Sequence, residues 1–428
     1  PASPFPTRRT LFTEPYSLNP TSHSPLATSH LPFPQTFLSS TKACQLNQRF
    51  YSLDVFRGAT VCLMILVNNP GSWGSIYDPL EHAPWHGLTP TDLVFPFFLF
   101  AVGNAMAFVM PRLEQGGDAV FWKKVATRSL LIFAVGLFLT WWPFVKWSGD
   151  HLVFKPWEFT DDKGQPQGVR LLGVLPRIAL CYFFAAIIVY YLKLRKAFYL
   201  GLLILILYWM LSYFLGDPAD PYSMKGWFGN AVDNALLGEA HMYKGEGMPF
   251  DPEGIMSTLP AIVQVIFGYM VGNYIQQKGK TYEMVTGLFA AGVGLLLAGF
   301  CWDMVFPINK KIWTSSYVVY TSGLAMITIA TMIYMIEFKN IKGGLARFFD
   351  VFGKNALFVF ALSAFLPKGF ALIRLGDGVN PWNWLYKKVL IHIPGAKENG
   401  SLLYAIAVIL FMWAICYWMD KKKIYVKV

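Results

Sequence analysis

The sequence has 428 residues, of which 55% are hydrophobic and only 14% are charged. Soluble domains carry about a quarter charged residues, so this composition excludes an ordinary soluble protein. The net charge of +11 comes from short Lys and Arg clusters at the ends of apolar blocks. That arrangement is typical of membrane topology signals and argues against nucleic-acid binding.

The apolar residues form separated blocks of membrane-spanning length, so we expect an all-α polytopic membrane protein with long extracytoplasmic loops. Residues 1–50 are rich in Pro, Ser and Thr and begin without Met. We expect them to be a disordered tail or a mis-called N-terminal extension. Residues 51–428 form the predicted transmembrane domain. Its ten predicted helices lie near 53–69, 89–110, 125–145, 170–192, 197–215, 256–276, 282–305, 315–336, 353–372 and 401–419.

The basic residues between these helices predict their orientation. They lie after the second, fourth, sixth, eighth and tenth helices: Arg112, Lys123, Lys124, Lys193, Arg195, Lys196, Lys278, Lys280, Lys339, Lys342, Arg347, Lys421, Lys422 and Lys423. The loop after the first helix has none. The positive-inside rule therefore predicts that both termini are cytoplasmic. Segments 146–169, 216–255 and 373–400 would face the other side, either as parts of a binding site or as interfacial connectors.

The segment EHAPWHG contains His82 at the outer end of the second helix. Histidine suits proton transfer near neutral pH, and Asp92 or Glu81 could orient its ring, although an isolated loop histidine is more often only solvated. His86 could complete a metal pair, but Pro84 disfavours a regular helix there and no third ligand is near. The five cysteines contain no CxxC motif and are odd in number. We therefore predict neither a metal site nor a disulfide framework.

Polar residues also mark both ends of the first helix. Asp54 and Arg57 lie one helical turn apart, as an interfacial ion pair or as an anchor for the phosphates of an anionic ligand. Asn68, at the other end, offers a donor and an acceptor to a reacting group or caps the helix. Arg177 lies well inside the fourth helix and must face the bundle interior. A structural pair with Asp54 or Asp92 explains it as well as a ligand does.

Three further pairs of polar residues flank apolar helices: Asp251 with Glu253, Asn309 with Lys310, and Lys354 with Asn355. Capping of the sixth helix would explain the acidic pair. The second pair shares the predicted outer side with the histidines. Lys354 lies at the cytoplasmic end of the ninth helix, where it could bind a phosphate or only extend its charge to the interface.

Seven segments carry a family resemblance: SLDVFRG, LVNN, HAPWHGLTPTDLVFPFFLF, GVLPRIALCY, FDPEGIMSTLPAI, PINKKIWTSSYV and FGKNALFVF. They are distributed over residues 51–360, and in this order they resemble the heparan-α-glucosaminide N-acetyltransferase family and its bacterial relatives. The last part of the chain resembles the family only in hydropathy. None of the motifs GxGxxG, GxxxxGK[ST], GxSxG or HExxH occurs in a suitable context, which argues against soluble nucleotide-binding enzymes and hydrolases.

The resemblance implies a multi-span membrane enzyme that takes acetyl groups from cytosolic acetyl-CoA and delivers them to an amino sugar or glycan amine across the bilayer. The family's catalytic histidine matches His82, and its asparagine at the end of the first helix matches Asn68. With the polar residues above, this gives a catalytic group (His82, Asn68, Asp92), an acetyl-CoA group (Asp54, Arg57, Arg177, Lys354, Asn355) and an acceptor group (Asp251, Glu253, Asn309, Lys310).

The sequence departs from the family in three respects. The loop between Asn68 and His82 is longer, and His86 stands where the lysosomal enzyme has asparagine. The large luminal domain of the animal enzyme has no counterpart here. We therefore expect a bacterial inner membrane and an acceptor other than heparan sulfate.

Two other functions compete with acetyl transfer. A transporter of a sugar or another polar solute would account for Pro-interrupted helices and a buried arginine, but no internal repeat supports it. A structural protein that docks partners on its outer loops leaves the intramembrane polar residues unexplained. Exposed apolar helix faces would allow a homodimer.

Overall fold

The computed structural model describes residues 49–161, 164–376 and 378–426, so the predicted disordered tail lies almost wholly outside the described residues. The long helices are α2 (Tyr51–Asn68), α3 (Val94–Trp141), α4 (Val174–Phe214), α6 (Ile255–Lys278), α7 (Tyr282–Asp303), α8 (Ser315–Ile333), α9 (Gly344–Lys354), α10 (Ala356–Phe370) and α12 (Lys397–Lys421). Shorter elements are the helices α5 (Phe228–Leu237) and α11 (Trp384–Lys388), the single turns η1 (Asp78–Leu80), η2 (Pro90–Leu93), η3 (Glu239–His241), η4 (Tyr334–Phe338) and η5 (Leu390–His392), and the strands β1 (Val145–Ser148), β2 (His151–Phe154), β3 (Glu158–Thr160) and β4 (Pro166–Gly168).

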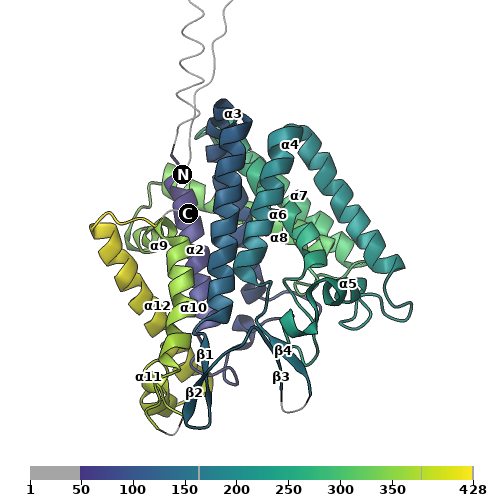
Figure 1. The fold of residues 1–428 in the computed structure, drawn as a ribbon. Helices are drawn as coiled ribbons and strands as arrows, with labels where there is room; N and C mark the ends of the chain where they lie inside the picture. The colour runs from purple at the N-terminus through teal and green to yellow at the C-terminus, as the bar shows by residue number, and fades with distance from the viewer. Residues whose placement is uncertain (1–48, 162–163, 377, 427–428) are drawn as a thin grey trace, which may run out of the picture. The chain divides into compact units, whose positions relative to one another are not determined.

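Seven of the described helices are long and apolar enough to cross a membrane, or eight if the bent pair α9 and α10 forms one span. They are the helices of an integral membrane protein. The prediction of ten spans is not confirmed, because α3 and α4 each run through two predicted segments. Gly117 in α3 (φ 75°) and Lys193 in α4 (φ 59°) interrupt the helical backbone, and α4 doubles back in Figure 1.

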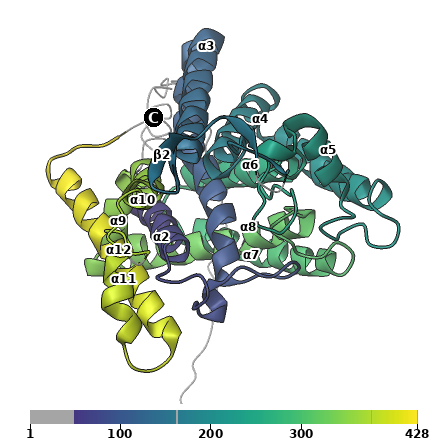
Figure 2. The same ribbon diagram turned by 60° about the horizontal axis from the view of Figure 1, so that its bottom comes forward.

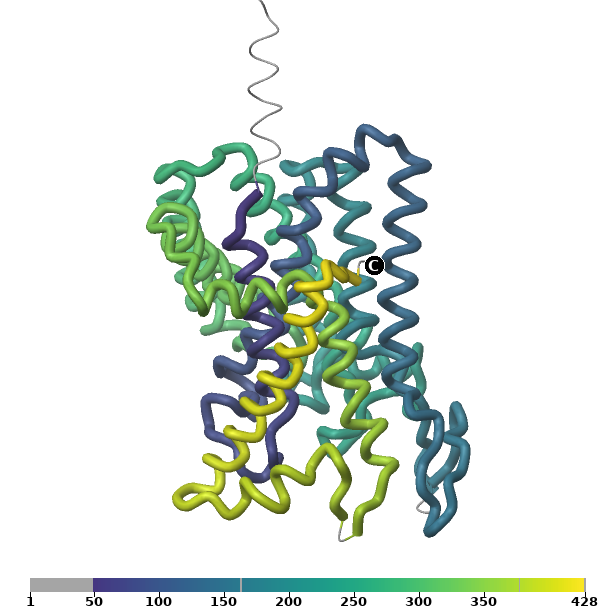
Figure 3. Tube along the Cα trace, turned by 90° about the vertical axis from the view of Figure 1, so that its left-hand side faces the viewer, coloured from purple at the N-terminus to yellow at the C-terminus, as the bar shows by residue number. Residues whose placement is uncertain are grey.

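The predicted helix near 353–372 corresponds to α10, which starts at Ala356, and the sequence did not predict that α9 precedes it as a separate helix with a bend of 79° between them. At the bend, the Asn355 side chain donates to the carbonyl of Ile424 (3.2 Å) and accepts from the amide of Val426 (2.9 Å). The C-terminal segment thus satisfies the polar groups of the bend. Figure 3 shows α9 lying across the bundle and α10 running along it.

Helix α6 forms the core of the bundle. Its most apolar window is 78% buried, whereas the windows of α4 and α7 are only 28% buried. Helices α6 and α3 pack closely because glycine lies at their contact: a Cβ on Gly103 would come within 1.9 Å of the Val265 oxygen, and one on Gly268 within 2.1 Å of the Phe100 oxygen. Small residues allow such close helix approach in membranes, and the outer helices keep apolar faces for lipid.

The segments predicted as long outer loops contain short elements of their own. Residues 146–169 include most of two antiparallel two-stranded sheets, β1 with β2 and β3 with β4. Helix α5 lies within 216–255 and α11 within 373–400. These elements gather at the end of the bundle opposite the turn of α4 (Figure 1). Seen from that end, the loop between α2 and α3 extends toward α7 and α8 (Figure 2).

Candidate active site

A cavity of about 250 Å³ lies where the end of α2 meets the start of α3 and the loops. Helix α2 ends at Asn68 because Pro70 cannot continue it, and the loop that follows brings His82 back over the helix end. The cavity brings together five residues that the sequence predicted: Asn68, His82, Asp92, Glu253 and Lys310. It also contains six that the sequence analysis did not select: Trp85, Arg170, Tyr243, Glu246, Lys311 and Trp313.

His82 and Asp92 form the central pair of the cavity. His82 Nδ1 lies 2.7 Å from Asp92 Oδ1, and the Asp92 side chain is 1% exposed. Asp92 Oδ2 accepts hydrogen bonds from the amides of Ala83 (3.0 Å) and Thr89 (3.2 Å). These bonds fix the carboxylate, which as an acceptor requires a proton on Nδ1 of the neutral imidazole. His82 Nε2 is then the nitrogen that carries the lone pair.

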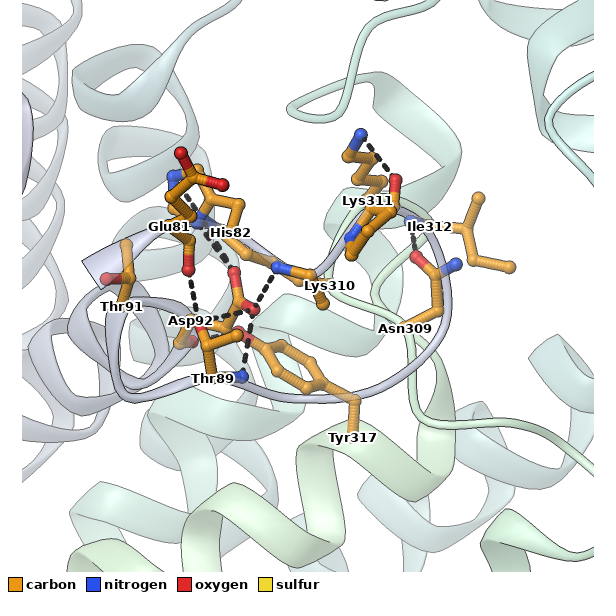
Figure 4. Close-up of polar contacts among 12 residues, drawn as sticks. Glu81, His82, Thr89, Thr91, Asp92, Asn309, Lys310, Lys311, Ile312 and Tyr317 are labelled. Atoms are coloured by element: carbon orange, nitrogen blue, oxygen red, sulfur yellow. Dashed lines mark hydrogen bonds and ion pairs between the residues drawn. The ribbon is translucent and has the colours of Figure 1, made fainter. Parts of the chain in front are cut away.

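Lys310, which the sequence predicts as an acceptor residue, lies beside His82 and Asp92. Its Nζ lies 3.0 Å from Nδ1 and 3.2 Å from Nε2 of His82, and 3.4 Å from Asp92 Oδ1 (Figure 4). Lys310 comes from the loop between α7 and α8, more than two hundred residues after His82. Burial lowers the pKa of Lys310, although the carboxylate of Asp92 favours its charged form. The result is a histidine flanked by one carboxylate and one ammonium group.

His86 and Asn309 do not line this cavity. Asn309 is fully buried, and its side-chain oxygen accepts from the Ile312 amide at 3.1 Å, which shapes the loop that presents Lys310. Asn309 Nδ2 lies 3.4 Å from His86 Nδ1, and burial lowers the pKa of His86. Asn309, predicted as an acceptor residue, is therefore enclosed within its own loop and does not line the cavity.

An ion-pair network closes one side of the cavity. Arg170 donates from Nε (2.9 Å) and Nη2 (2.5 Å) to the carboxylate of Asp251, and also to Glu253. Asp251 is buried behind the cavity and also accepts from the Tyr243 amide at 3.3 Å. Of the predicted acidic pair, only Glu253 faces the cavity. The arginine that neutralises both acids carries no sequence signal beyond its place before an apolar run.

Arg177 lies outside both cavities that contain the other predicted residues. Its side chain is fully buried, its Nη2 donates to the Gly254 carbonyl (3.3 Å) and to Ser257, and its guanidinium lies 5.0 Å from the centre of the Trp313 ring. Among the described residues it forms no ion pair, so the expected pairing with Asp54 or Asp92 is not seen.

A second cavity, of about 720 Å³, lies at the other end of α2. It brings together Asp54, Arg57 and Lys354, as predicted, with Arg49, Tyr51, Lys280, Glu337, Lys342, Asp350, Gly353 and Tyr425. Arg57 Nη1 lies 3.4 Å from Asp54 Oδ1 and 3.3 Å from the Gly353 oxygen. Lys354 pairs with Asp350 at 2.8 Å. Asn355 is buried beside this cavity and does not line it.

Comparison with known proteins gives relatives along most of the chain, although no family model matches it. Heparan-alpha-glucosaminide N-acetyltransferase of Homo sapiens is 27% identical over 437 aligned residues, which include 90% of this chain. The Mus musculus protein of the same name is 26% identical over 89% of the chain. The resemblance to the heparan-alpha-glucosaminide N-acetyltransferase family is confirmed. The chain spans 60% of the length of these two relatives.

Within the part of the chain that the structure describes, no three His, Cys, Asp or Glu side chains are grouped so as to hold a metal ion. The His82 cavity contains the imidazole of His82, the carboxylate of Asp92, the ammonium group of Lys310 and the amide of Asn68. These are the functional groups that acyl transfer to an amine requires.

Proposed function

We propose that this protein is a membrane acetyltransferase that moves the acetyl group of acetyl-CoA to the amine of an amino sugar or glycan on the other side of the bilayer. The observation that carries the proposal is the grouping of His82, Asp92 and Lys310 in one cavity at the end of α2. The similarity to two N-acetyltransferases supports it.

In the direct route, the acceptor reacts as the free amine, and His82 Nε2 takes a proton from its nitrogen as that nitrogen attacks the thioester carbonyl. The new C–N bond forms, the C–S bond breaks, and the proton passes to the departing CoA thiolate. Asp92 holds the Nδ1 proton and stabilises the imidazolium that forms, because its carboxylate is fixed 2.7 Å away. Asn68 and Lys310 are the donors available to the carbonyl oxygen as its negative charge develops.

A second route uses His82 Nε2 as the nucleophile, so that the imidazole carries the acetyl group before the amine takes it. The same hydrogen bond from Nδ1 to Asp92 serves both routes. Rapid acid quench after mixing the protein with labelled acetyl-CoA alone separates them. Label retained on the protein, and lost in a His82→Ala variant, supports the acetyl-histidine route.

Acetyl-CoA is proposed to bind with its phosphates in the second cavity, at the start of α2. Five basic side chains line it against three acidic ones: Arg49, Arg57, Lys280, Lys342 and Lys354 against Asp54, Glu337 and Asp350. This surplus of cations suits a ligand with several phosphate charges. The pantetheine arm would then follow α2 toward His82, with both termini on the acetyl-CoA side of the membrane.

The test is acetyl transfer by the purified protein in lipid nanodiscs. We expect release of free CoA from acetyl-CoA that depends on added glucosamine, with N-acetylglucosamine as the product. A transporter is the other candidate, because the 79° bend between α9 and α10 is also a feature of transport proteins. Uptake of labelled glucosamine into proteoliposomes, without any acetylated product, would favour transport and contradict the proposal.

A further inference from the structure

The His82 cavity has two chemically different sides. Its helix side is apolar and includes Met64 and Val67 of α2 and Phe98 of α3. Its loop side carries charged groups from three separate loops, among them Glu246 and Lys311. A thioester on a flexible arm suits the apolar side, and a polyhydroxylated acceptor suits the charged one, because buried polar groups require hydrogen-bond partners.

Glu246 and Lys311 form an ion pair on the loop side. Lys311 Nζ lies 2.5 Å from Glu246 Oε2 and donates to the Pro84 carbonyl at 2.9 Å. Each side chain is 18% exposed, so the pair is partly open to the cavity that both residues line. Within the described residues, Glu246 Oε1 has no hydrogen-bond partner. The pair therefore offers a free carboxylate oxygen next to an ammonium group, and its net charge is zero.

Trp85 is held rigidly beside this pair. Its Nε1 donates to the Tyr222 carbonyl at 2.9 Å, and its ring packs edge-on against Phe250 with the centres 5.5 Å apart. Lys311 Nζ lies 5.9 Å from the centre of the Trp85 ring. A fixed aromatic ring beside paired charges can contact the apolar C–H surface of a sugar while the charges bind its hydroxyl groups.

The ion pairs of Arg170 have a different environment. Arg170 is engaged by both Asp251 and Glu253, and this network leads directly into the start of α6. Loss of that network would disturb the helix packing. The pair of Glu246 and Lys311 instead joins two surface loops, after η3 and before α8, so it can be altered with less effect on the bundle.

We propose that Glu246, Lys311 and Trp85 form the acceptor subsite of the cavity and select the acceptor amine by the hydroxyl groups on its ring. This inference rests on the proposed acetyl transfer and adds the residues that choose the acceptor. Glu246 accepts hydrogen bonds from sugar hydroxyl groups, Lys311 donates to them, and Trp85 contacts one face of the ring. The cavity of about 250 Å³ has room for a sugar ring beside His82.

The experiment compares two acceptors, glucosamine and cyclohexylamine, which both offer a primary amine on a six-membered ring but differ in hydroxyl groups. The ratio of kcat/KM for glucosamine to that for cyclohexylamine measures hydroxyl recognition. We expect Glu246→Gln and Lys311→Met to lower this ratio about ten- to a hundredfold, as the loss of a charge-assisted hydrogen bond does. The KM for acetyl-CoA should stay at the parent value.

Matched controls are Glu239→Gln and Lys225→Met, which alter exposed residues of the same outer region that do not line the cavity. Both should keep the parent ratio. Lys311→Arg, which can preserve the ion pair, should retain more of the preference than Lys311→Met. If the parent transfers acetyl to glucosamine and both pocket variants keep its preference over cyclohexylamine, the subsite is wrong. If the parent acetylates neither amine, the proposed function fails first.

Discussion

The two ends of α2 differ in how their charges are balanced. The cavity at Asn68 has three acidic and three basic side chains, and each carboxylate there has a cationic partner. The cavity at Arg57 has five basic and three acidic side chains and nearly three times the volume, about 720 Å³ against 250 Å³. A balanced site suits neutral hydroxylated ligands and proton transfer, whereas a cationic one suits phosphates.

This difference implies that substitutions in the cavity at one end of α2 should affect different kinetic constants from substitutions at the other end. Variants near Asn68 should change the rate or the acceptor, and variants near Arg57 should change the affinity for acetyl-CoA. Variants at one end should therefore leave the property that depends on the other end at its parent value.

The largest effect is expected from His82→Ala. Loss of a positioned acid–base group lowers the rate by about 10²–10⁴-fold, and loss of an acyl carrier can cost more. Binding of labelled CoA should keep its parent affinity, because His82 lies at the opposite end of α2 from the cationic cavity. His86→Asn is the control, since His86 lies outside the cavity, and it should keep most of the activity. Parent-like turnover by His82→Ala would rule out the proposed mechanism.

A smaller loss is expected from Lys310→Met, at about 10²-fold in kcat, as for removal of one donor to a developing oxyanion. The neighbouring variant Lys311→Met is the informative comparison, because it should mainly raise the KM of the sugar acceptor. Lys310→Arg should restore part of the rate through a positive group near His82 and Asp92. Equal effects of Lys310→Met and Lys311→Met on both constants would contradict the division of labour between them.

At the other end of α2, Arg57→Ala should raise the KM for acetyl-CoA about tenfold or more, through loss of charged hydrogen bonds to phosphate. Acceptor KM should not change. Arg112→Ala removes an exposed arginine that lines neither cavity, and it should leave both constants at parent values. A folded Arg57→Ala protein with parent affinity for CoA would reduce Arg57 to a structural partner of Asp54.

Hydropathy alone predicted where most helices lie, because long apolar blocks must form helices in a bilayer. It could not predict the separate helix α9 before the ninth predicted helix, nor that Asn355 at the bend would bond to the C-terminal segment, since that depends on hydrogen bonds between distant residues. The β strands at 145–168 were missed because they are only three or four residues long and contain no buried residue.

Within the site, the pairing of His82 with Asp92 could be anticipated because both residues belong to one loop and the turn that follows it. Lys310, Glu246 and Arg170 reach the same cavity only through the fold, from loops that are far apart in the sequence. The residue types of Glu246 and Arg170 gave no signal, and the sequence selected Lys310 without indicating its contact with His82. Asn309 was selected together with Lys310, its neighbour in the sequence. Asn309 is buried and does not line the cavity, although Lys310 does.

The smallest predicted effect concerns the contact between α5 and the start of α6. Asp233 of α5 is fully buried, and its Oδ1 accepts from the amides of Ile255 (2.8 Å) and Met256 (3.2 Å) at the start of α6. Its Oδ2 has no partner among the described residues. Burial raises the pKa of Asp233 from 3.8 to about 6, although the two amides favour its charged form.

Because the pKa of Asp233 is higher in the folded protein than in the unfolded chain, the protonated carboxyl group stabilises the fold. This contribution is complete below about pH 4 and is lost as the pH rises through about 6. Asn keeps the Oδ1 acceptor without the charge. Asp233→Asn should therefore raise the thermal midpoint by a few degrees at pH 7.5, about 1–3 kcal/mol, and leave it unchanged at pH 4. Thermal unfolding in detergent at the two pH values tests this. An equal shift at both would mean that the carboxylate charge does not weaken the contact between α5 and α6.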